Sequence, residues 1–164
     1  MRQMEALTVG MLLLAFADAY VTAEWFHIPI WVTFIAWASF FILGGGTDGW
    51  TRSVVSNIVG IILGSLTLLA IELTPDNVFL NSIFVGVGSA AMVQAAKWEL
   101  ISKLPAIVWG YASLVGTRFV TDVPVLTPDL ISHPTAVCIV AMVTGACLGF
   151  VHELIANGLT KKTS

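Results

Sequence analysis

Residues 54–71 read VVSNIVGIILGSLTLLAI, a run without a charged side chain. A helix over this run is long enough to cross the hydrocarbon core of a bilayer, which takes about 20 residues. The whole chain has the same character, since 57% of its 164 residues are hydrophobic, 10% are charged and the mean hydropathy is +0.92. Soluble domains carry about 25% charged residues. The composition therefore predicts an integral membrane protein, and the small net charge of −3 gives no sign of a nucleic-acid partner.

Five further apolar segments flank this run, separated by turn-forming or charged residues. Proline and glycine favour breaks between helices, as in the glycine-rich stretch 44–49 and in the loop 121–133 with its prolines. The six predicted spans cover residues 7–25, 30–43, 54–71, 78–96, 105–120 and 135–151. We therefore expect an all-α fold with six transmembrane helices, forming one domain over residues 1–164 with short connections.

The first apolar segment has a second interpretation. Residues 7–14, followed by Ala15-Phe16-Ala17, resemble a cleavable signal peptide. Glu5 is unusual in the positive region of such a peptide, and the apolar run continues to Phe26. We therefore interpret the segment as a retained first helix.

The basic residues predict the orientation in the membrane. With six spans, all but one of the seven fall on the same side, namely Arg2, Arg52, Lys97, Lys103, Lys161 and Lys162. Positively charged loops stay in the cytoplasm, so both termini are predicted to be cytoplasmic. The exception is Arg118, at the outer edge of the fifth span. A five-span alternative divides the basic residues more evenly and is less favoured.

The two halves of the chain show a weak internal repeat. Trp37 and Trp109 lie 72 residues apart, and the same offset pairs five further identical residues between positions 19 and 116. An offset of 85 pairs the Gly60-xxx-Gly64 motif with Gly145-xxx-Gly149. Three spans per half is an odd number, so the halves, about 7–73 and 78–156, would be inverted relative to each other, as in many transporters. The alternative is a chance resemblance between apolar hairpins.

The two glycine motifs also have a mechanical interpretation. Glycines one turn apart leave a flat stripe on which a second helix can pack closely. We expect Gly60, Gly64, Gly145 and Gly149 to act in helix packing.

Polar residues within spans are the candidate functional residues. Asp18 lies about seven residues inside the first span, where a charge costs about 2.5–3.5 kcal/mol. Arg118 lies at a comparable depth, so the two are either a buried pair or separate side chains that reach the interface. Candidates for a solute path are Asp18, Trp37, Asn57, Trp109, Tyr111 and Arg118. Candidates for an outer vestibule are Glu24, His27 and Glu72. Interhelical hydrogen bonds, packing and solvated loop charges are the structural alternatives.

No sequence pattern points to an enzyme, a metal or a cofactor. The chain has no P-loop, nucleophile elbow or His-x-x-x-His spacing, and the adjacent His152 and Glu153 point about 100° apart on a helix. We therefore expect no catalytic activity, no metal site and no cofactor.

Two sequence stretches resemble a known family. They are Trp31-x-x-Phe34 with Ala38-x-Phe40-Phe41-x-x-Gly44-Gly45 and the following Gly49, and Leu104-Pro105-x-x-x-x-Gly110-x-Ala112. The chain resembles a family of small bacterial inner-membrane proteins that is catalogued as a domain of unknown function. The resemblance implies a polytopic helical fold in the cytoplasmic membrane and brings no substrate.

The sequence favours a transport function. Short loops, tightly connected helices and aromatic residues near the midplane are typical of a narrow path for a small polar solute, and so small a bundle predicts a homo-oligomer. A channel or facilitator is the leading hypothesis. A proton- or ion-coupled carrier and an accessory membrane subunit without transport activity are the alternatives.

Overall fold

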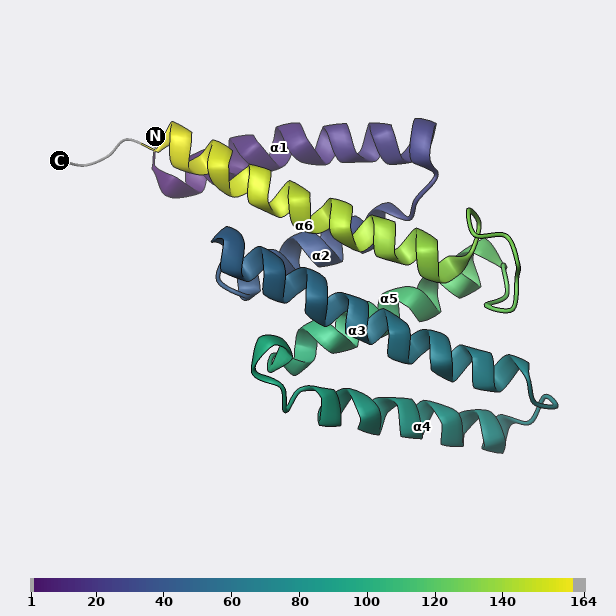
Figure 1. Cartoon of the computed structure of the whole chain (residues 1–164). Coiled ribbons are helices and arrows are strands. Elements are labelled where there is room, and N and C mark those ends of the chain that lie inside the picture. The colour runs from purple at the N-terminus through teal and green to yellow at the C-terminus, as the bar shows by residue number, and fades with distance from the viewer. Residues whose placement is uncertain (1, 161–164) are drawn as a thin grey trace.

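The structure, a computed structural model, describes residues 2–160, and these form six α-helices without a β-strand (Figure 1). The helices are α1 (Gln3–Val21), α2 (Ile30–Ile42), α3 (Gly46–Glu72), α4 (Val78–Ala95), α5 (Leu104–Thr121) and α6 (Pro134–Leu159). A π-helix, η1 (Thr22–Phe26), continues α1, and a 3₁₀ turn, η2 (Glu99–Ile101), follows α4. The all-helical fold with six helices is confirmed.

The helices α3 and α6 extend by eight residues beyond one end of their predicted apolar spans. We expected residues 44–49 to be a turn, but only Gly44 and Gly45 lie outside α3, which begins at Gly46. The Glu153 carboxylate on α6 accepts a hydrogen bond from the Gly46 amide at 2.7 Å. The first amides of a helix lack partners within the helix, so this contact supports an early start. α6 likewise continues past residue 151 to Leu159.

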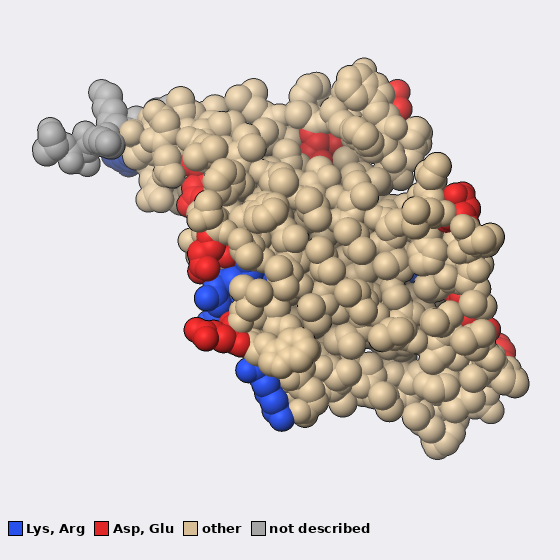
Figure 2. Space-filling view, viewed as in Figure 1, with Lys and Arg blue, Asp and Glu red and all other residues tan. Residues whose placement is uncertain are grey.

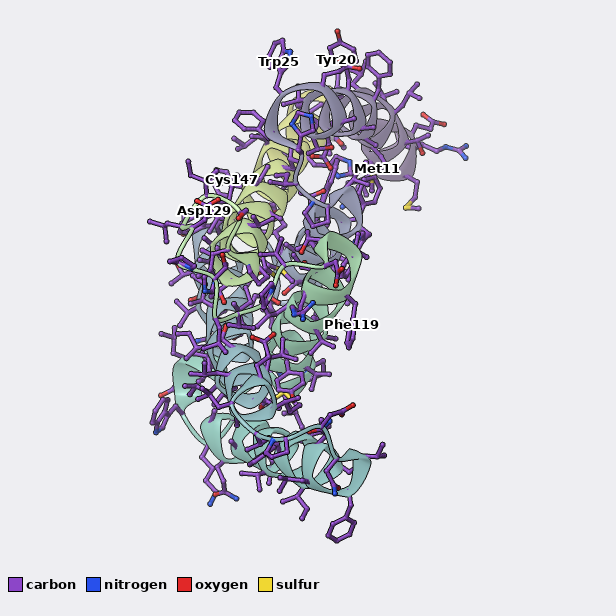
Figure 3. All side chains as sticks on the ribbon, turned by 90° about the vertical axis from the view of Figure 1, so that its right-hand side faces the viewer. Met11, Tyr20, Trp25, Phe119, Asp129 and Cys147 are labelled. Atoms are coloured by element: carbon purple, nitrogen blue, oxygen red, sulfur yellow. The ribbon has the colours of Figure 1, made fainter. Side chains whose placement is uncertain are left out.

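The helices form an elongated bundle in which α1 and α4 lie at opposite edges (Figures 1 and 3). Between them, α2 packs against α6 and α3 packs against α5, while α3 and α6 also contact each other. α1 is attached mainly to α6, and α4 mainly to α3. The edge helices are therefore the least buried, and the best-packed core lies among the four inner helices.

Within residues 2–160, four helical segments are long and apolar enough to cross a membrane: Gln3–Phe26, Gly46–Glu72, Val78–Ala95 and Pro134–Leu159. α2 has 13 residues and so spans about 20 Å, less than the roughly 30 Å of a bilayer core. Its side chains include several of the most buried in the molecule, such as Val32, Ala36 and Phe40. The fold is thus compatible with a membrane protein, whereas six complete spans stay a prediction.

Both ends of the described chain lie at the same end of the bundle (Figure 1). At that end Arg52 pairs with Asp48 at 2.9 Å and donates to the Glu99 carbonyl at 3.2 Å. Figure 2 shows Lys and Arg side chains gathered along this edge of the visible face. Lys161 and Lys162, which entered the predicted charge pattern, lie outside the described residues.

Candidate functional site

Glycines bring the inner helices into backbone contact. A Cβ added to Gly60 would overlap the Ile107 carbonyl of α5, and one added to Gly145 would overlap the Thr33 carbonyl of α2. The second glycine of each motif, Gly64 or Gly149, lies against side chains of the same partner helix. The two glycine motifs therefore lie where α3 crosses α5 and where α6 crosses α2.

This close packing buries most of the predicted path residues. Trp37 and Asn57 are 2% and 0% exposed, and Tyr111 is buried, whereas Trp109 is half-buried. The Asn57 amide nitrogen donates to the Ser53 carbonyl at 2.8 Å and to Ser39 Oγ at 3.1 Å. Asn57 thus ties α3 to α2, which is the interhelical alternative to a solute path.

Asp18 is a buried acidic residue within an apolar helix. Its side chain lies on α1, is 4% exposed, and has its Oδ2 2.5 Å from the Thr33 hydroxyl of α2. The Thr22 hydroxyl donates to the Asp18 backbone carbonyl at 2.6 Å, at the point where α1 changes into the π-helix η1. Single turns of π-helix are frequent at functional sites.

A pocket opens beside the Asp18 carboxyl. It has a volume of about 200 Å³ and lies between α1 with η1 on one side and α6 on the other. Thr22 and Thr144 are its other polar side chains, and the remaining wall is apolar, formed by Ala17, Val21, Phe26, Ile28, Val140 and Leu148. A carboxyl and two hydroxyls in an apolar wall can orient one small polar molecule.

A second polar site on the same helix seam contains His152, which is 2% exposed. The Trp37 indole N–H donates to its Nδ1 at 3.1 Å, and its Nε2 lies 2.8 Å from the Leu7 carbonyl. Because an indole N–H only donates, the imidazole is neutral, with its hydrogen on Nε2 directed at Leu7. A Cβ at Gly10 would meet the imidazole ring, so this glycine lets α1 approach α6. His152 therefore fastens α1 to both α2 and α6.

Arg118 has a different partner from the one we considered. Its Nε lies 2.8 Å from the Glu72 carboxylate, and its Nη1 lies 3.5 Å from Asp122. Asp18 contacts Thr33 instead, so the interpretation as an Asp18–Arg118 pair is wrong. The other interpretation, with each side chain at the interface alone, fails as well, because Asp18 is buried and Arg118 is paired.

Glu72 also holds the loop between α5 and α6. Its carboxylate accepts hydrogen bonds from the amides of Val125 and Leu126, both at 3.1 Å. His133 Nε2 lies 2.9 Å from the Val125 carbonyl, and the Val125 side chain is buried in the core. Further along, hydrogen bonds from the Ser132 hydroxyl and the Ile131 amide lower the pKa of Asp129. The long loop is therefore a fixed part of the fold.

The sequence matches one described family, "Protein of unknown function (DUF1097)", over residues 6–157. The chain belongs to the DUF1097 family. The resemblance seen in the sequence is confirmed. No curated protein and no solved structure matches the chain.

Membership of the DUF1097 family assigns no activity, so the predicted vestibule has to be judged on geometry. Glu24 lies in η1 and is exposed, and His27 is an exposed residue with a left-handed backbone (φ 51°). Tyr20 and Trp25 project outward from this edge, with ring centroids 6.4 Å apart (Figure 3). Among the described residues, Glu72 bonds to Arg118 and to the loop amides, and it forms no hydrogen bond or ion pair with Glu24 or His27.

Sequence reasoning on this DUF1097 chain missed His152 and Thr33. We considered His152 only as a metal or proton site beside Glu153, although residues 145, 149 and 152 share one face of a helix. That spacing places His152 on the same face as the glycines and so toward the neighbouring helices. Thr33 carried no signal, because a lone threonine in an apolar helix is common.

We expect His152→Phe to destabilise the protein by about 1–3 kcal/mol, because the buried indole N–H of Trp37 loses its acceptor. Replacing both partners, in Trp37→Phe/His152→Phe, should recover part of this loss. Unfolding with increasing SDS in mixed micelles measures both values. Leu154→Phe, at an exposed position of the same helix, is the control. A double variant as unstable as the sum of the singles would contradict the hydrogen bond.

Proposed function

We propose that the chain is a membrane transport protein for a small polar solute, and that the solute binds in the pocket between α1 and α6. The observation that carries this proposal is the Asp18 carboxyl, buried within a helix long enough to span a membrane and forming part of a pocket wall. Ionisable groups inside the membrane are costly and usually belong to a transport path.

The pairing of the helices supports two inverted halves. In such a repeat α1 corresponds to α4, α2 to α5 and α3 to α6. The contact between α3 and α5 then corresponds to the contact between α6 and α2. The contact between α1 and α6 likewise corresponds to the contact between α4 and α3. The exchanged helices run in opposite directions (Figure 1). This pattern is the one expected of an inverted 3+3 repeat, in which the third helix of each half packs on the other half.

The glycine contacts favour a particular register for this repeat. Gly60 lies on Ile107 as Gly145 lies on Thr33, so residues of α2 and α5 correspond at an offset of 74. The identities in the sequence suggested 72, which pairs Trp37 with Trp109. An offset of 74 pairs Trp37 with Tyr111.

The two edge helices make corresponding contacts, although their glycines are 78 residues apart and not 74. Gly10 of α1 faces His152, and its counterpart Gly88 of α4 faces Thr67 and Tyr111. The histidine site is therefore a feature of the first edge helix alone. This difference between the halves fits a solute site on α1 and a structural role for α4.

The buried core favours a carrier over a permanently open channel. Trp37 and Asn57, which would line a central path, are packed between helices. α1 is an edge helix that contacts mainly α6, so movement of α1 opens the pocket at the least cost in packing. The charge pattern and the family resemblance support a location in the bacterial cytoplasmic membrane with both termini inside. Both this location and assembly into a homo-oligomer are part of the proposal.

Purified protein in liposomes tests the transport function. We expect flux of urea, a small amide or an ion above that of protein-free liposomes, with saturation at high solute concentration. Asp18→Asn should reduce the flux at least about tenfold, which corresponds to about 1.4 kcal/mol. Gly86→Ala, an exposed change on α4, serves as the matched control.

The alternative function is an accessory subunit. If folded protein moves no solute and co-purifies with another membrane protein, the transport proposal fails and the accessory role is supported. Linear flux without saturation would instead support a channel.

A further inference from the structure

The Thr33 hydroxyl has more acceptors than hydrogens. Its oxygen lies 2.5 Å from Asp18 Oδ2 and 2.7 Å from the Ile30 carbonyl. A hydroxyl carries one hydrogen and can also accept. Within a helix a threonine hydroxyl commonly donates to a nearby backbone carbonyl, which here is that of Ile30. If it does so, Thr33 has no hydrogen left for the short contact between its oxygen and Asp18 Oδ2. A hydrogen on Asp18 resolves this count, because the acid then donates to Thr33 and Thr33 donates to Ile30.

The surroundings of Asp18 point the same way. The described ion pairs involve Arg52 and Arg118, and neither includes Asp18. The pocket wall contributes no other titratable side chain from α1, η1 or α6. Tyr20, Glu24 and His27, which follow Asp18 along the chain, are exposed, and Thr33 of α2 is uncharged. An ionised carboxylate would thus be buried without a counter-charge, which is costly in a membrane.

We propose that Asp18 carries an exchangeable proton, held by Thr33 in the conformation described here, and releases it when α1 moves and the pocket admits water. The pocket gives the proton an exit, because the carboxyl forms part of its wall. The change from α-helix to π-helix after Val21 places the bend of α1 in this proposal about one turn from the acid. Release and solute entry then use the same opening.

The presence of the proton does not depend on transport, whereas its coupling to solute movement rests on the proposed function. In the coupled form, the proton and the solute alternate at the carboxyl. A cationic or hydrogen-bond-donating solute such as a small amide or ammonium ion would take the place of the acid hydrogen, since an ionised carboxylate only accepts.

Infrared difference spectroscopy on the full chain in liposomes tests the proton directly. At pH 7 an exposed aspartate is protonated in only about one molecule in a thousand. Wild type minus Asp18→Asn should show the C=O band of a carboxylic acid, and transfer to D₂O should shift it. Thr33→Val should move the band to higher frequency, because the acid hydrogen loses its acceptor. Glu24→Gln, at an exposed carboxylate, should leave the band unchanged.

Each outcome decides one part of the proposal. Carboxylate bands in place of the acid band at pH 7 would overturn it. An acid band that resists D₂O for hours would overturn exchange through the pocket. If the acid band is present while liposomes show no solute flux, the proton site stands and the transport function fails. If both are present, proton release measured with a trapped pH dye should accompany solute uptake and disappear in Asp18→Asn.

Discussion

Gly145→Ala should destabilise the folded protein by about 3 kcal/mol, at the upper end of the cost of overpacking a core. The added methyl group would overlap the Thr33 backbone carbonyl, and a backbone atom cannot turn aside as a flexible side chain can. α2 and α6 would have to separate, which loosens the contacts of Phe40 with Gly149 as well. Gly60→Ala should have a similar effect, because Ile107 of α5 lies in the same relation to it. The loss is measured as a lower SDS fraction at half-unfolding in mixed micelles.

Gly86→Ala is the matched control for these two variants. Gly86 is also a helical glycine in an apolar segment, but nothing lies within 4 Å of an added Cβ. Alanine is favoured over glycine in a helix by up to about 1 kcal/mol, so this variant should be as stable as wild type or slightly more so. If Gly145→Ala and Gly86→Ala unfolded at the same SDS fraction, the backbone contact between α2 and α6 would be contradicted.

The sequence predicts the helices well because length and apolarity act locally. The predicted spans 54–71 and 135–151 fall where α3 ends and where α6 begins to within a few residues. The early start of α3 could not be predicted. It depends on a hydrogen bond from Gly46 to Glu153, two residues far apart in the chain.

The partners of the buried charges were harder to predict. Asp18 and Arg118 lie at similar depth, but depth along a helix says nothing about the direction in which a side chain points. α1 packs mainly on α6, and α5 packs mainly on α3, so the two side chains face different neighbours. Glu72 ends α3 and Arg118 lies in the last turn of α5. Their position on the same side of the predicted membrane was the available signal for this contact.

Glu72→Gln should lower the free energy of unfolding by about 2–3 kcal/mol, because the change removes the negative charge from a largely buried, hydrogen-bonded ion pair. The side chains of Arg118 and Glu72 are 21% and 14% exposed, so water replaces the pair only in part. Arg118→Gln should have a comparable cost. Because the pair contributes to both single losses, the double variant should cost less than their sum by about 0.5–3 kcal/mol.

Two measurements separate this pair from a general loss of packing. Arg118→Gln combined with Asp18→Asn should be additive to within about 0.5 kcal/mol, since these residues have no shared partner in the structure. Hydrogen exchange should accelerate at the amides of Val125 and Leu126 in Glu72→Gln, because both donate to that carboxylate. In Arg118→Gln the carboxylate is still present, so these amides should stay protected. Equally fast exchange in Glu72→Gln and Arg118→Gln would show that the loop is held by the ion pair as a whole. A non-additive loss of stability in the Asp18→Asn/Arg118→Gln double variant would contradict the structure, which places these two side chains apart.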